Sequence, residues 1–158
     1  MYVFTTNRTD MQELDEIIYA ALTANTALMT EVGGHIKSTC FEVPPTSEDN
    51  VPLPYIIITD DPWQNEMESK DDEWESDSDI VQASVIINAK SPKDVKRLRR
   101  QIRHIIAEYV EDMEYEARPE LRSLSNEGIS WDWTKPCYFD TLHYQCEMYL
   151  NIEDNEQD

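Results

Sequence analysis

The sequence predicts an α+β fold: one domain with a mostly antiparallel, mixed β-sheet of four to five strands and two main helices packed on one face. Two segments carry apolar residues at helical spacing, and others alternate or are continuously apolar, as strands are. The strands follow one another between the helices, an order typical of sheets built from hairpins. With 158 residues the chain fits one domain, so we expect residues 1–158 to form a single unit.

The first helix is expected to begin at Asp10, whose carboxylate can accept hydrogen bonds from the first-turn amides, with Glu13 completing a capping box. Tyr19 falls on the face opposite the apolar stripe. A short helical turn over 26–32 is expected to end at the glycine pair 33–34, because glycine tolerates the left-handed conformation that follows helices. The apolar stripe consists of Met11, Leu14, Ile17, Ile18, Ala21 and Leu22.

Strands are expected at 36–43, 55–59 and 80–89. The apolar run at 55–59 is continuous, which indicates a central strand buried on both faces. Residues 60–79 hold ten acidic residues and one lysine. They predict a long surface loop or an extended hairpin tip, poorly ordered in an isolated monomer. In the third strand the residues expected to face the core are Val81, Ala83, Val85, Ile87 and Ala89.

The second helix, 92–113, has the clearest signals. Ser91 can cap it, Pro92 suits the first helical position, and Asp94 places an acid in the first turn. Its buried stripe is expected to be Val95, Leu98, Ile102, Ile105, Ile106, Tyr109 and Met113. Strands at 129–133 and 142–152 should complete the sheet, with a frayed acidic segment at 153–158. The predicted core is Leu14, Ile17, Ile18, Ile56, Ile58, Val85, Ile87, Leu98, Ile102, Ile105, Tyr144 and Met148.

The net charge limits the choice of partners. Thirty-three acidic and thirteen basic residues give a formal charge of −20, which repels nucleic acid and anionic membranes. No apolar run approaches the ~20 residues that span a bilayer, and no signal peptide is apparent, so we expect a soluble protein made in a cytoplasm. The three cysteines, Cys40, Cys137 and Cys146, are expected to be free thiols.

No catalytic set, cofactor-binding motif or metal site stands out in the sequence. The chain has three glycines and no glycine-rich phosphate loop. His35, His104 and His143 are widely spaced and lack the pattern of metal ligands. The acidic run 71–79 lacks the glycine of an EF-hand loop, so a solvated loop is favoured over a calcium site. We therefore expect no enzyme activity, no cofactor and no metal.

The second helix concentrates the basic residues on the face opposite its apolar stripe. A solvated helix face is the plain interpretation, and nucleic-acid binding is opposed by the total charge. The sharper hypothesis is a docking face for an acidic surface, such as the 71–79 region of another copy. The hypothetical interface residues are Tyr19, Lys93, Lys96, Arg97, Arg100, Arg103, Asp71, Asp72, Glu73, Trp74, Glu75 and Asp77.

Five segments, taken in order, carry a resemblance to a known family. They are the opening helix at 14–22, the stretch from Thr26 to Ile36 with its glycine pair, the proline-led strand at 51–58, the helix at 92–113 and the closing strand at 142–152. Together they resemble the tail-terminator, or tail-completion, proteins of long-tailed bacteriophages. The order of the parts carries the match, over roughly 11–152, and the acidic stretch 60–79 and the aromatic segment 131–133 depart from it.

The resemblance implies a virion structural protein that forms a ring, expected to be hexameric, at the head-proximal end of the tail. Such a ring stops tail-tube polymerisation and joins the tail to the head connector. Its partners would be copies of itself, the tail-tube protein and head–tail connector proteins, assembled in the cytoplasm of a bacterial host. DNA would pass through without specific binding, and no membrane is involved.

Two alternatives remain open. Another neck ring, such as a head-completion protein, fits the same sequence features. A different class, an acidic inhibitor that mimics DNA, fits the charge of −20. The cationic helix opposes the mimic, because a mimic requires an unbroken negative surface.

Overall fold

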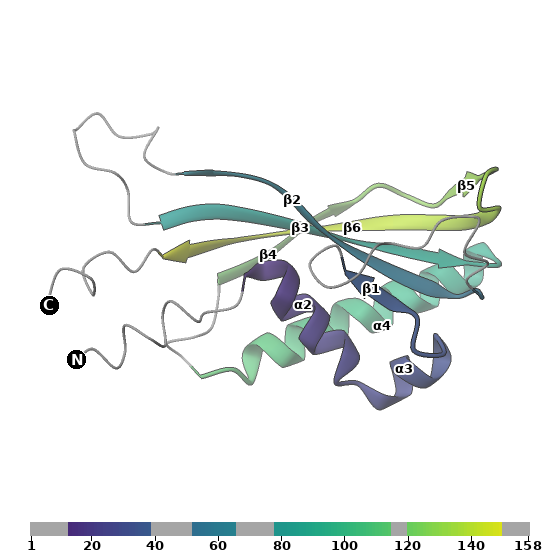
Figure 1. The fold of residues 1–158 in the computed structure, drawn as a ribbon, viewed down its shortest axis with the longest axis horizontal. Coiled ribbons are helices and arrows are strands. Elements are labelled where there is room, and N and C mark those ends of the chain that lie inside the picture. Colours follow the sequence, from purple (N-terminus) through teal and green to yellow (C-terminus); the bar gives the residue numbers. More distant parts are fainter. Residues whose placement is uncertain (1–12, 39–51, 66–77, 115–119, 150–158) are drawn as a thin grey trace, which may run out of the picture.

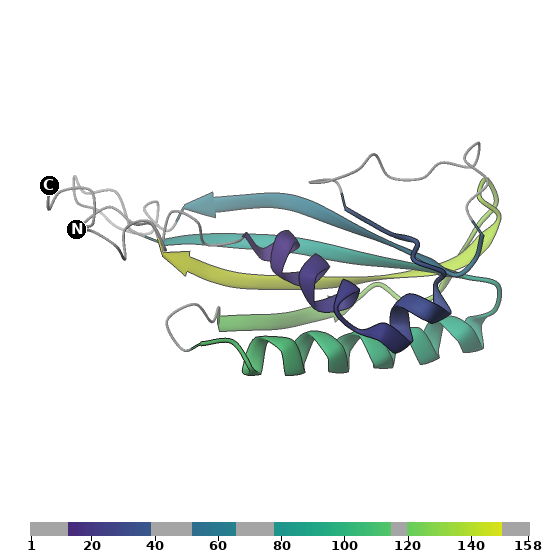
Figure 2. The same ribbon diagram turned by 60° about the horizontal axis from the view of Figure 1, so that its bottom comes forward.

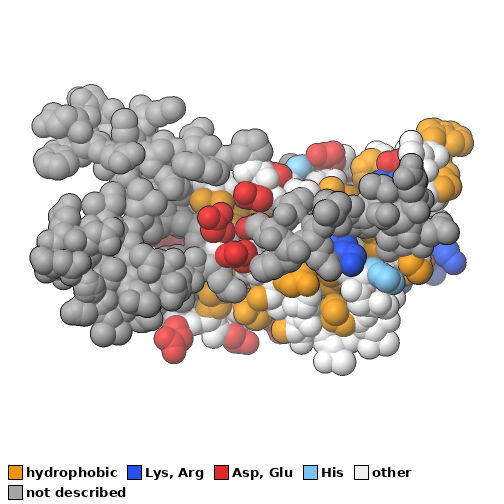
Figure 3. Space-filling model, in the orientation of Figure 1, with side chains coloured by type: hydrophobic (Ala, Val, Ile, Leu, Met, Phe, Trp, Pro, Cys, Tyr) orange, Lys and Arg blue, Asp and Glu red, His pale blue; other side chains and the backbone are white. Residues whose placement is uncertain are grey.

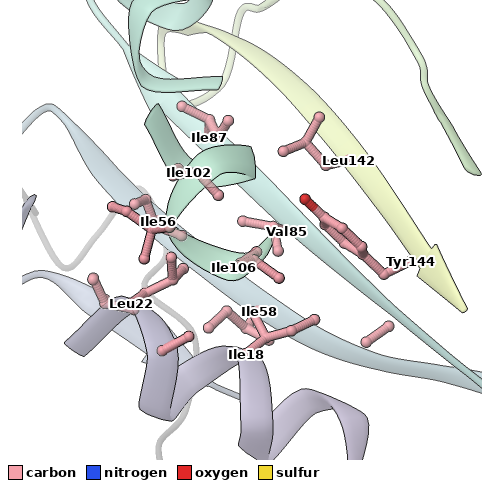
Figure 4. Close-up of a cluster of buried hydrophobic side chains, with 14 of the residues drawn as sticks. Ile18, Leu22, Ile56, Ile58, Val85, Ile87, Ile102, Ile106, Leu142 and Tyr144 are labelled. Atoms are coloured by element: carbon pink, nitrogen blue, oxygen red, sulfur yellow. The ribbon is translucent and has the colours of Figure 1, made fainter. Parts of the chain in front are cut away.

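The computed structural model describes residues 13–38, 52–65, 78–114 and 120–149. In these ranges three helices and six strands form one mixed sheet with helices against one face, so the α+β class is confirmed (Figure 1). The sheet has one strand more than the upper limit expected. The core residues of both layers meet between the sheet and the helices, as Figure 4 shows.

The sheet order is β1-β2-β3-β6-β4, and β5 also pairs with β6. Only β1 runs parallel to its neighbour, and every other described pairing is antiparallel. The strands are β1 (Ile36–Ser38), β2 (Tyr55–Asn65), β3 (Ser78–Ala89), β4 (Glu120–Asn126), β5 (Ser130–Asp132) and β6 (Cys137–Tyr149). β6 therefore pairs with β3 along one side and with both β4 and β5 along the other.

The first described helix, α2 (Leu14–Thr23), starts later than the sequence predicted. Its N-cap is Glu13 instead of Asp10, and the Glu16 carboxylate accepts a hydrogen bond from the Glu13 amide at 2.9 Å. A capping box is present, as predicted, but it lies three residues later in the chain. Tyr19 is half-buried and packs against the core, so its expected place on an outer face is wrong.

The short helix α3 (Thr26–Glu31) has Asn25 as its N-cap and is followed by the expected glycine pair. The Asn25 side chain accepts a hydrogen bond from the Leu28 amide at 2.9 Å. After the helix, Gly33 and Gly34 have φ of +60° and +79°, values that L side chains rarely adopt. Their amides bond back to the carbonyls of Thr30 and Met29, which closes the helix with a Schellman motif.

The main helix, α4 (Pro92–Glu111), confirms the clearest sequence signals. Ser91 Oγ accepts a hydrogen bond from the Asp94 amide at 3.1 Å, and Pro92 occupies the first turn. The fully or nearly buried stripe is Val95, Leu98, Ile102, Ile105, Ile106 and Val110, while Tyr109 and Met113 are partly buried at its margin.

The acidic region 60–79 is only partly the loop that the sequence predicted. β2 continues through Asp60 and Asp61 to Asn65, and β3 begins at Ser78, so both ends of the region belong to paired strands. The alternative interpretation, an extended hairpin, is correct for these ends. Residues 66–77 lie outside the described residues, as do the predicted strand beyond Ser38 and the segment after Tyr149.

The predicted core is largely correct. Eleven of the twelve predicted residues are buried, and the side chain of the twelfth, Met148, lies outside the described part. Cys137 and Cys146 are buried free thiols, as expected, and burial raises the pKa of Cys146 to about 12. In the described ranges, no helix has the length and apolar character needed to cross a membrane.

Candidate functional site

A groove of about 800 Å³ runs between α4 and β4. We call it the α4/β4 groove. One wall is a flank of α4, the other is β4, and the floor includes a residue of β6. Figure 2 shows β4 running beside α4, with β6 as the next strand of the sheet. The lining residues are Lys96, Arg99, Arg100, Arg103, His104, Ala107, Val110, Glu111, Leu121, Ser123 and Tyr144.

The groove exists because α4 does not cover the whole sheet. The helix packs on β3 and β6 through its apolar stripe, while α2 packs on β1, β2 and β3. Leu121 and Ser123 of β4 therefore remain at the open side of α4, half-buried and exposed respectively. The lining residues of α4 recur at three- and four-residue intervals, so they form a second face of the helix beside the buried one.

The cations of α4 fall into two groups. Arg97 bonds to Glu31 of α3 and lies 3.2 Å from Asp94, and these contacts raise its pKa. Arg99 lies 2.7 Å from the buried Asp140. In the described ranges, no ion pair or hydrogen bond joins the side chains of Lys93, Lys96, Arg100 and Arg103 to any acid.

Tyr144 forms the floor of the groove from β6. Its side chain is 2% exposed, and its hydroxyl has no hydrogen-bond partner among the described residues. Burial raises the pKa of Tyr144 to about 12, and the nearby positive charge of Arg103 opposes that rise. Figure 4 shows the Tyr144 side chain among apolar residues of the core, near Val85 and Leu142. The Tyr144 ring is thus surrounded by apolar side chains, although the positive charge of Arg103 is nearby.

Asp140 fixes the geometry at one end of the groove. Its carboxylate is fully buried and accepts bonds from Arg99 at 2.7 Å and from the Asn126 side chain at 2.8 Å. The backbone amides of Gly128 and Thr141 donate to its other oxygen at 2.9 and 2.7 Å. This single carboxylate therefore ties α4 to β6 and to the connection between β4 and β5.

A polar network crosses the sheet on the face away from the helices. Ser84 Oγ contacts Asp61 Oδ2 and lies 2.8 Å from His143 Nδ1, and His143 Nε2 lies 2.8 Å from Glu127. The set contains a serine, a histidine and an acid, but the single hydroxyl proton of Ser84 is donated to the Asp61 carboxylate. The imidazole consequently donates to Ser84, which is opposite to the proton transfer that activates a serine nucleophile. The network instead links β2, β3 and β6.

Three carboxylates could hold a cation at the start of α2. Oxygens of Glu13, Asp15 and Asp60 all lie within 4.8 Å of one another. Burial, followed by the charges of Asp15 and Asp61, raises the pKa of Asp60. Figure 3 shows acidic side chains gathered in this part of the surface. Burial, together with the nearby charges of Asp15 and Asp61, accounts for the raised pKa of Asp60 without a bound ion.

Two tryptophans form an exposed apolar tip at the far end of the sheet. Trp133 is 85% exposed and Trp131 is 37% exposed. Their rings meet edge to face with centroids 5.7 Å apart, and Trp131 also packs on Tyr138 at 4.7 Å. Figure 3 shows an apolar group protruding at this end of the molecule.

The structure describes six of the twelve predicted interface residues. Lys93, Lys96, Arg97, Arg100 and Arg103 are all exposed on α4. Tyr19 is half-buried and lies on α2, apart from the groove lining. The six predicted acidic and aromatic residues, Asp71, Asp72, Glu73, Trp74, Glu75 and Asp77, lie outside the described residues, as does the calcium loop that the sequence disfavoured.

Sequence reasoning missed β4, and with it the groove. Glu120–Asn126 has little of the β-branched and aromatic content that predicts strands, and it is held by pairing with β6. The networks around Asp140 and Ser84 were missed as well, because each joins residues distant in sequence. One contact could have been predicted from the pairing of β3 with β6 alone, because Ser84 lies directly opposite His143.

Comparison with known proteins adds no identification. No protein-family model matches the chain, and no curated protein matches it either.

Proposed function

We propose that this chain is a phage tail terminator: a structural subunit that forms a ring at the head-proximal end of a long tail and joins the tail to the head connector. The proposal rests on the resemblance of the ordered parts in the sequence and on the charge distribution of the folded subunit. The ring stops polymerisation of the tail tube. In this proposal the subunit's work is recognition between proteins.

The observation that carries the proposal is the row of cations beside the α4/β4 groove that have no acidic partner among the described residues. A chain of net charge −20 would be expected to use its few cations to neutralise its own acids. Arg97 and Arg99 do so, whereas Lys96, Arg100 and Arg103 face the groove without an acidic partner in the described ranges. Unlike surfaces on one subunit suit a head-to-tail ring, because each joint uses two different faces.

The same row weighs against the DNA-mimic alternative. A mimic presents continuous negative charge to a DNA-binding protein, and a cationic groove interrupts that surface. The net charge also supports passage of DNA through a ring, since acidic walls do not bind phosphates.

The proposal is tested in the virus and in solution. Deleting the gene should leave filled heads and tails of irregular length that do not join, which electron microscopy of lysates would show. Purified protein should have a ring-sized mass by light scattering at low salt and a smaller mass at moderate salt, because exposed ion pairs are screened. Normal yields of infectious virions from the deletion would overturn the proposal.

A charge-reversal variant tests the groove in the same setting. Lys96, Arg100 and Arg103 changed together to Glu should leave the subunit folded, because all three are exposed, yet prevent ring formation and tail completion. The matched control is Arg97→Gln on the same helix. Arg97 is already paired within the subunit, so this control should assemble normally.

A further inference from the structure

The α4/β4 groove changes in character along its length. Toward the end of α4 it is lined by Ala107, Val110 and Leu121, and beyond them by the single acid Glu111. Toward the start of α4 it is lined by Arg103, Arg100 and Lys96. A segment that fills the groove must therefore be apolar in one half and anionic in the other.

The chain contains a segment of that composition directly after β6. Residues 150–158 read Leu-Asn-Ile-Glu-Asp-Asn-Glu-Gln-Asp. In an extended conformation alternate side chains share a face. One face then carries two apolar residues followed by three acids: Leu150, Ile152, Asp154, Glu156 and Asp158. The other face carries a single acid, Glu153.

The spacings of the two charge rows correspond. Lys96 and Arg103 are seven residues apart, which is about 10 Å along a helix at 1.5 Å per residue. Asp154 and Asp158 are four residues apart, which is about 13 Å in an extended chain. Flexible arginine and lysine side chains can reach across a difference of this size. Each of the three cations can therefore face one carboxylate.

β4 provides a backbone that an extended segment can lie along. It is the last strand of the described sheet order, and of the described strands only β6 pairs with it. Edge strands of this kind bind extended peptides through main-chain hydrogen bonds. The apolar-to-cationic direction of the groove is the direction in which β4 itself runs, because β4 begins at the end of the sheet where β6 ends.

The segment that fits comes from another copy. β6 runs antiparallel to β4, so it leads the chain toward the apolar end of its own groove and away from the cations. To enter that groove the same chain would have to reverse, and a tight turn takes about two residues. Leu150 and Ile152 would then lie in the turn instead of in the apolar half. A second copy needs no such reversal.

We propose that the α4/β4 groove of one copy binds residues 150–158 of a second copy, with Leu150 and Ile152 over Leu121 and Tyr144 and with the three acids against Lys96, Arg100 and Arg103. This deepens the proposed function, on which it rests, by naming both surfaces of the joint. It replaces the 71–79 region, which was the earlier candidate for the acidic side.

A charge swap in the full-length chain tests the pairing. Reversing the acids (Asp154→Lys, Glu156→Lys, Asp158→Lys) or the cations (Lys96→Glu, Arg100→Glu, Arg103→Glu) should each leave a monomer by light scattering. Both changes in one chain should restore the assembly. The matched control Glu153→Lys, on the other face of the segment, should assemble like the unchanged chain. Failure of the double variant to assemble would overturn the proposal, and so would a loss of assembly in the control.

A mixture shows whether the joint is between copies. The acid-reversed chain keeps an intact groove, and the cation-reversed chain keeps an intact segment. Mixed together, they should assemble with the two chains alternating in equal amounts, because an unchanged groove meets an unchanged segment at one joint and a reversed groove meets a reversed segment at the next. Two monomers in the mixture would overturn the proposal.

A labelled peptide locates the contact. A peptide of residues 150–158 should bind the acid-reversed chain and should bind at least about tenfold more weakly when the three groove cations are also reversed. Binding by a peptide of residues 66–77 in place of this one would overturn the choice of segment. Rings that survive acid reversal would overturn this inference and leave the proposed function standing. Mixed assemblies that form open fibres in place of rings would support this inference and overturn the proposed function.

Discussion

The two flanks of the sheet's helical face are built differently. On one flank, α2 buries Leu14, Ile17 and Ile18 against β1, β2 and β3. On the other flank, α4 buries one stripe against β3 and β6 but leaves β4 open beside a row of cations. The first flank stabilises the fold, and the second keeps the α4/β4 groove open, which is the surface that we propose for a partner. We therefore expect substitutions on the first flank to lower stability and substitutions on the groove face of the second flank to weaken assembly.

The largest loss of stability is expected for a substitution of Asp140, which joins α4 to β6. Asp140→Ala removes a buried carboxylate that pairs with Arg99 and accepts two backbone amides. The unpaired donors should lower the free energy of unfolding by about 3–5 kcal/mol in chemical denaturation.

The control for this change is the exposed pair on the same helix. Arg97→Gln breaks the contact with Glu31 at the surface and should cost about 0–1 kcal/mol. Equal losses for the two variants would show that the Asp140 network does not hold the open flank together.

The second effect contrasts the two faces of α4. Ile102→Ala leaves a cavity in the core and should cost about 2–5 kcal/mol. Arg100→Ala, two residues away on the groove face, should change stability by less than about 0.5 kcal/mol while weakening assembly. A loss below about 0.5 kcal/mol for Ile102→Ala would contradict the assigned phase of the helix.

The smallest effect concerns the floor of the groove. Tyr144→Phe removes a buried hydroxyl that has no partner in the described part of the chain. Because an unsatisfied polar group costs about 1–3 kcal/mol on burial, the variant should be as stable as the parent or more stable by about 1 kcal/mol. Thermal melting would measure this. A clear loss of stability would mean that the hydroxyl is bonded in solution.

Local signals account for what the sequence predicted. Ser91, Pro92 and Asp94 specify the start of α4 through contacts within one turn, and alternation in β3 sets which side chains face the core. The core of both flanks could be predicted for the same reason. The expected start of α2 was three residues early because two overlapping acid patterns fit the same cap.

Distant contacts account for what the sequence did not predict. β4 forms because β6 offers it a partner, and its own residues favour a strand only weakly. The cations of α4 could be recognised, yet their division into paired and unpaired groups depends on Glu31 and Asp140, which lie far away in the chain. The cationic wall of the candidate site could therefore be predicted from the sequence, whereas the wall formed by β4 could not.

The position of β6 in the chain also determines when a newly made polypeptide can complete the α4/β4 groove. Translation produces β6 after every other described strand, and in the described ranges β4 and β5 pair with β6 alone. While the ribosome is still making it, α2, β2, β3 and α4 are already available to fold, but the far edge of the sheet and Tyr144 are not. A chain released before β6 is made therefore has no completed α4/β4 groove, and it would lack the surface that we propose for assembly.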